Sequence, residues 1–125
     1  MEKKFVMTAF GYAILGLLLG MFMGMSGDHS EMPTHAHIML IGFVVSFVYA
    51  LCHKFWIDNA TTKQAKIQFF VHQIGTAIMV IGLYLMFGGY VESEIVEPVL
   101  GIGSTLVFIA MVMMKIMVMK SYKTA

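Results

Sequence analysis

The chain has 125 residues, of which 59% are hydrophobic and 12% charged, and its mean hydropathy is +0.84. Soluble domains carry about 25% charged residues, so this balance indicates an integral membrane protein and excludes an ordinary soluble domain. The formal net charge is only +1. Without a basic patch interleaved with aromatic residues, nothing in the sequence supports nucleic-acid binding.

Four apolar runs, at about 5–25, 36–57, 67–90 and 96–119, each reach the roughly 20 residues that a helix needs to cross a bilayer. Because the connections are short, we expect one all-α transmembrane domain over residues 1–125, an antiparallel bundle of these helices. The first run has full spanning length and lacks a small-residue cleavage site after it. We therefore interpret it as a mature helix rather than a signal peptide.

Gly16, Gly20 and Gly24 recur every four residues along the first run. Such a stripe lets another backbone or a flat ligand approach closely. We favour packing against the second or fourth helix, with a dimer seam or a cofactor wall as the alternative.

Soft metal ligands gather where the first run ends. Thioether and imidazole groups together suit Cu(I), and the segment GDHSEM resembles the Met and His repeats of periplasmic copper-resistance proteins. The simpler interpretation is that methionine, which is abundant in this chain, packs as an apolar residue. The candidate copper ligands are Met21, Met23, Met25, His29, Met32 and His35.

The second run opens with PTHAHIML, which places His35 and His37 at its start. Pro33 and Thr34 favour a helix start here. On a helix, two residues two apart point about 200° apart, so only one can face the bundle. We expect His37 to face inward, with His35 as a supporting or dimer-contact neighbour.

A second level of histidines is predicted at the other membrane surface. His53 ends the second run and His72 lies early in the third, so the two could face each other or flank a planar group. Bis-histidine haem needs such a pair on facing helices, with small residues beside the ring edge. Gly75 and Thr76 could supply that room. The alternative is that His53 marks the membrane interface and His72 donates to a carbonyl or water.

Charge sets the expected orientation. Lysine is the basic residue throughout, and its bias places both termini in the cytoplasm; short loops favour a prokaryotic inner membrane. Lone Cys52 cannot form an internal disulfide and should pack as a small hydrophobe. The lysines are Lys3, Lys4, Lys54, Lys63, Lys66, Lys115, Lys120 and Lys123, and the acidic residues of the opposite surface are Asp28, Glu31, Glu92, Glu94 and Glu97.

The segments HAHIMLIGFVVSFVYALCHKFW and FFVHQIGTAIMVIGLYL resemble small four-helix membrane proteins related to subunit I of the haem-copper oxidases. The resemblance covers about half of the chain. It implies a low-spin haem ligand at His37 and a second histidine segment at His72. Met39 stands where the small relatives commonly have Asn, and no copper-B histidine trio or tyrosine cross-link motif is recognisable.

Three hypotheses follow. The first is a haem-b protein that forms a homo-oligomer and carries electrons with a redox partner or senses a diatomic ligand. Its leading axial ligands are His37 and His72, with His53 and His35 as alternates. The second is a copper-handling protein that uses the outer Met and His residues. The third is a structural or assembly factor without a cofactor. Complete oxygen reduction by this chain alone is not expected, and a role other than enzyme is preferred.

Overall fold

A computed structural model of the chain describes residues 1–57 and 62–124, with side chains to residue 121. Everything in these ranges is helix, turn or irregular backbone, without strands. Four helical spans are long and apolar enough to cross a membrane, as predicted. The elements are α1 (Glu2–Ser26), α2 (Met32–His37), η1 (Ile38–Val45), α3 (Ser46–Phe55), α4 (Lys63–Phe87) and α5 (Ser93–Thr124).

Three of these elements form the second span without a break, from Met32 to Phe55. Its middle part, η1, is a π-helix of 8 residues. In a π-helix each N–H reaches one residue further back than in an α-helix, and such turns are frequent at functional sites. The apolar sequence IMLIGFVV carries no signal for this change, and we did not predict it.

Every span begins three or four residues before its predicted start, at Glu2, Met32, Lys63 and Ser93. Polar residues continue the helix beyond the apolar core because helical hydrogen bonds do not require a hydrophobic side chain. The start of α4 is capped by Thr62, whose side chain accepts a hydrogen bond from the Ala65 N–H at 3.2 Å. The second and third spans end earlier than predicted, at Phe55 and Phe87.

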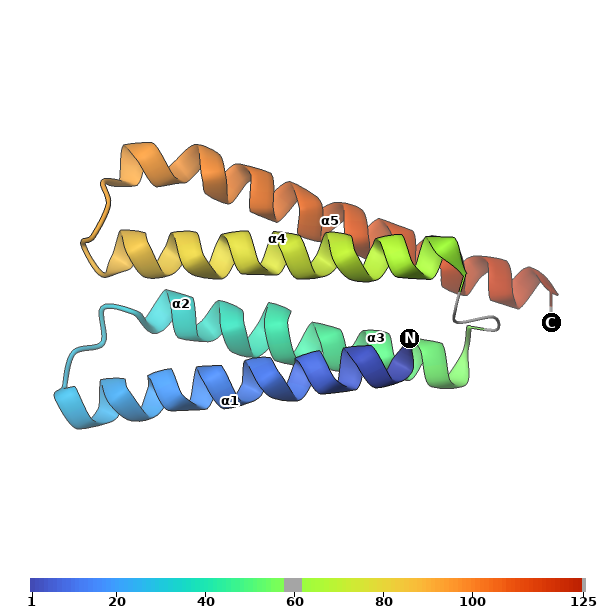
Figure 1. Cartoon of the computed structure of the whole chain (residues 1–125), viewed down its shortest axis with the longest axis horizontal. Coiled ribbons are helices and arrows are strands. Elements are labelled where there is room, and N and C mark those ends of the chain that lie inside the picture. Colours follow the sequence, from blue (N-terminus) through green and yellow to red (C-terminus); the bar gives the residue numbers. More distant parts are fainter. Residues whose placement is uncertain (58–61, 125) are drawn as a thin grey trace.

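The lysines lie toward one end of the molecule, which we call the basic end. In Figure 1 the N-terminus, the end of α3, the start of α4 and the C-terminal part of α5 lie toward this end. The α1–α2 and α4–α5 connections lie at the opposite, acidic end. Lys123 is predicted at the same end, but its side chain lies outside the described part of the chain.

The helices pack mainly as two pairs: α1 lies along η1 and α3, and α4 lies along α5 (Figure 1). Glycines allow the close approach within both pairs. A Cβ at Gly75 would lie 3.0 Å from the Gly103 carbonyl oxygen on α5. On α1, side chains at Gly16 and Gly20 would meet Met39 and His35 respectively. This confirms packing against the second helix for that part of the glycine stripe, although nothing lies within 4 Å of a Cβ at Gly24.

A cluster of mutually packed buried side chains lies toward the basic end. It joins all four spans, and aromatic residues from α1, α3 and α4 meet in it. Cys52 is buried in this cluster with a free thiol, as predicted. Its buried members are Phe5, Tyr49, Ala50, Cys52, Ala65, Phe69, Met114 and Met117.

Candidate functional site

His53 and His72 are both buried beside the aromatic cluster, and one phenyl ring contacts both. Phe5 of α1 stacks on the His53 imidazole, with ring centroids 5.6 Å apart and planes 19° apart. The centroid of the His72 ring lies 6.4 Å from that of Phe5. Phe5 is itself fully buried. The structure therefore brings the predicted pair to one place, with an aromatic side chain rather than open space beside both rings.

His72 is held by hydroxyl groups. Its Nε2 lies 3.1 Å from the Oγ of Ser46 and 3.5 Å from the Oγ1 of Thr76. The Tyr49 ring packs edge-on against the imidazole at a centroid distance of 5.0 Å. All these side chains are at most 1% exposed. The site thus fixes the orientation of His72 from its own helix and from the second span.

His53 has no such support. It is 4% exposed, and within residues 1–57 and 62–124 neither ring nitrogen has a hydrogen-bond partner. The Nδ1 of His72 is likewise without one, and the Ile41 carbonyl interacts with this imidazole without meeting hydrogen-bond geometry. Buried polar atoms in proteins are usually paired. The two unpaired nitrogens of His53, beside the buried His72 imidazole, therefore make this the candidate site.

The room predicted beside His72 is not available, which corrects one expectation. Gly75 faces α5, where a Cβ would lie 2.9 Å from the Cβ of Leu106 and 3.0 Å from the Val107 nitrogen. Thr76 turns its hydroxyl toward His72. The small residue therefore serves the contact between α4 and α5, because two backbones can approach this closely only where one side chain is missing.

The outer histidines each anchor one ring nitrogen on a backbone carbonyl. The Nδ1 of His35 lies 2.8 Å from the Gly16 oxygen of α1, and the Nδ1 of His37 lies 2.7 Å from the Pro33 oxygen. An Nδ1–H that donates to a carbonyl leaves Nε2 as the atom with a lone pair, the tautomer found in metal-ligating histidines. His35 is thus the residue that packs toward α1, whereas His37 bonds within its own helix.

His37 and His72 lie at different depths. His72 contacts Ser46, which follows His37 by nine residues, most of them in the π-helical segment η1. Two histidine levels therefore exist, with His35 and His37 at one and His53 and His72 at the other. The pairing of His37 with His72 as axial ligands of one haem stays a prediction from the sequence.

The predicted copper ligands lie on the last part of α1, in the α1–α2 connection and on α2. Met25 is 81% exposed and Met23 only 3%, so they point in different directions from α1. His29 is exposed, and the His35 Nδ1 is bonded to Gly16. In the described part of the chain, no group of three or more His, Cys, Asp or Glu side chains could hold a metal ion.

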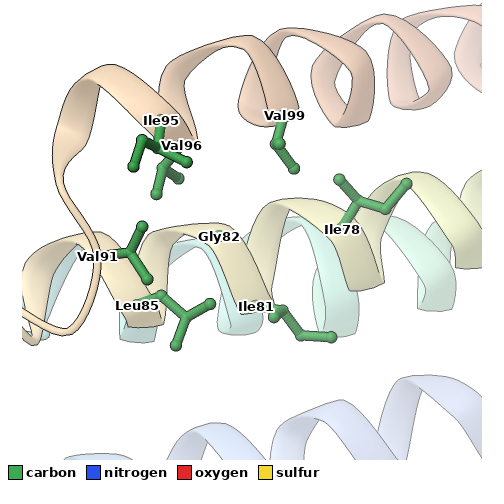
Figure 2. A pocket seen from close by; sticks show the side chains of 8 residues that line it. All are labelled: Ile78, Ile81, Gly82, Leu85, Val91, Ile95, Val96 and Val99. Carbon is green, nitrogen blue, oxygen red and sulfur yellow. The ribbon is translucent and has the colours of Figure 1, made fainter.

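A groove between α4 and α5 near the acidic end has a different character. It encloses about 280 Å³, and Figure 2 shows aliphatic side chains from both helices pointing into it. No polar side chain lines it, so it offers shape without a group for chemistry or recognition. It is lined by Ile78, Ile81, Gly82, Leu85, Val91, Ile95, Val96 and Val99.

Comparison of the chain with protein-family models, with curated proteins and with solved structures gave no significant match. The resemblance to small oxidase-related proteins therefore stays a prediction from the sequence.

Proposed function

We propose that the chain is a haem-b-binding membrane protein whose candidate iron ligands are His53 and His72. The observation that carries the proposal is the buried His53 imidazole, neither nitrogen of which has a hydrogen-bond partner, beside the buried His72. An unpaired buried polar group costs about 1–3 kcal/mol, so this place is unfavourable unless something binds there. Neutral imidazole is a common axial ligand of haem iron.

The imidazole nitrogens of His53 and His72 are suitable ligands of haem iron, but the Phe5 side chain occupies the space beside them. Its ring contacts both imidazoles, so a porphyrin at this place requires the Phe5 side chain to move. Phe5 lies near the start of α1, where helix ends open most readily. The outer histidines His37 and His35 are the alternate ligands, and their carbonyl-anchored Nδ1 atoms favour Nε2 coordination.

A bound haem would supply a one-electron redox couple. The residues of this chain would hold the two imidazoles neutral in an apolar environment and exclude water through the surrounding aromatic rings. Ser46 and Thr76 would keep the His72 ring in place. Electron transfer or the sensing of a diatomic ligand or redox state fits such a site, and complete oxygen reduction does not, since no copper-B histidine trio is recognisable in the sequence.

The test is a reduced-minus-oxidised optical spectrum of the detergent-purified protein, with iron and copper measured on the same sample. We expect a haem-b signature that His53→Ala and His72→Ala each abolish. The matched control is His29→Ala, which removes an exposed histidine. Loss on His37→Ala alone would move the ligands to the outer level. A colourless protein from haem-replete cells would refute the haem proposal and leave copper binding or a structural role.

We also propose that the helices form an antiparallel bundle with both termini in the cytoplasm of a prokaryotic cell, as the lysine bias predicts. Supporting this, the end of the second span and the start of α4 share the basic end with the N-terminus (Figure 1). Single cysteines at positions 28 and 123, in a Cys52→Ala background, would test it. We expect an impermeant thiol reagent to label position 28 only in intact cells. Mass measurement in detergent tests the proposed homo-oligomer.

A further inference from the structure

A second groove, between α1 and α4 at the basic end, differs from the apolar one because two of the side chains that border it are lysines, whose aliphatic stems line it. It encloses about 320 Å³, and its lining residues are Lys3, Lys4, Met7, Thr8 and Phe69. We propose that this groove binds an anionic phospholipid, with the phosphate on the lysines and an acyl chain along the apolar side chains.

The charges beside this groove are available for a ligand. Lys3 and Lys4 are exposed, and neither forms an ion pair with any residue that the structure describes. Both lie in the first turn of α1, at the level where a membrane-spanning helix leaves the apolar layer. Pockets of basic residues between helices at a membrane surface are suited to anionic lipid headgroups, and each lysine near the surface strengthens binding about fivefold.

The apolar part of the groove selects a lipid over a free phosphate ion. Met7 is 71% exposed and follows the lysines by one turn toward the membrane interior. The Phe69 ring forms the α4 side, and the Thr8 hydroxyl is occupied by the Lys4 and Phe5 carbonyls. With no other polar side chain in the lining, this surface suits an acyl chain that enters from the bilayer.

The groove lies directly against the proposed histidine site. Phe69 packs edge-on against Phe5 with ring centroids 4.9 Å apart, and Phe5 contacts both imidazoles. A lipid in the groove therefore touches the ring that packs against Phe5. The lipid site itself does not depend on haem, since its residues and charges are independent of the histidines.

The experiment is native mass spectrometry of the whole chain with phosphatidylglycerol and with phosphatidylcholine of the same acyl chains. We expect preferential retention of phosphatidylglycerol, and a roughly 25-fold weaker affinity in the Lys3→Gln/Lys4→Gln variant. The control, Lys54→Gln/Lys115→Gln, removes the same charge from the basic end but leaves the groove intact, and should bind normally.

Three results would overturn the proposal. Equal weakening in the two double variants would mean attraction by net charge rather than by this groove. Unchanged affinity in Lys3→Gln/Lys4→Gln would place the lipid elsewhere. Competition by inorganic phosphate as strong as that by phosphatidylglycerol would mean an anion site without a role for the acyl chain.

Discussion

Replacing His53 with leucine should stabilise the haem-free protein. A neutral imidazole carries one donor and one acceptor, and both nitrogens of His53 are buried without a partner. Each unpaired group costs about 1–3 kcal/mol. Against this gain stand the lost ring stacking on Phe5, about 0.5–1.5 kcal/mol, and imperfect packing, about 1–3 kcal/mol. Taking the middle of each range, we expect a net gain of about 1 kcal/mol.

The sign should reverse in the haem-loaded protein. A ligand that binds only the folded state stabilises it by about 2.7 kcal/mol at one hundred times its Kd, and the variant would lose that contribution with its iron ligand. The assay is thermal unfolding in detergent of protein from haem-deficient and from haem-supplemented cells. His29→Leu is the control, and at this exposed position the free energy of unfolding should change by less than about 0.5 kcal/mol.

Two results would refute the reasoning. A haem-free His53→Leu protein that is less stable than the wild type would mean that His53 has a partner that satisfies it. Equal gains with and without haem would mean that His53 is unpaired but binds no iron.

Three further predictions concern the helix contacts and the acidic end. Gly75→Ala should destabilise the protein by about 1–3 kcal/mol in the same unfolding assay, because the new Cβ would press on the α5 backbone. The control is Gly101→Ala, where nothing lies within 4 Å of the new Cβ, and it should be neutral or up to about 1 kcal/mol stabilising. Equal effects of the two substitutions would contradict the packing described. Tyr12→Phe should cost about 0.5–1.5 kcal/mol, since it removes the 3.1 Å hydrogen bond to the Gln73 Oε1; unchanged unfolding would mean that this bond is not formed in the membrane. The backbone N–H of Ser30, and then its side chain, lower the pKa of the Asp28 carboxyl below 3.8. Any ordering of the α1–α2 connection that this hydrogen bond provides is therefore present above that pH and is lost as pH falls through the lowered pKa. Carbon NMR titration of Asp28 checks this, and a titration midpoint above 3.8 would contradict it.

The spans could be predicted because hydropathy reports the thickness of the apolar layer, which fixes how many residues must be buried. Helix ends could not, since Lys63 and Ser93 extend helices into polar surroundings where hydropathy carries no information. The predicted starts are too late at all four spans for this one reason.

The site was predicted in part. An imidazole within a membrane span is costly enough to mark His72 and His53 from the sequence, and both are buried. Phe5 was missed, because one phenylalanine in an apolar run looks like any other. The room assigned to Gly75 was wrong because sequence spacing gives the face of a glycine but not its neighbour, which is here the α5 backbone.

The π-helical segment η1 changes the direction in which side chains point between the start and the end of the second span. Because its hydrogen bonds span five residues, each residue advances through a smaller angle than in α2 or α3. His35 before it can therefore point at α1 while Ser46 after it points at α4, an assignment of faces that a uniform α-helix would not give. A one-residue deletion within η1 would turn one histidine level relative to the other without shortening the span below the membrane thickness. The length of this segment, more than its composition, thus sets which neighbours each level meets.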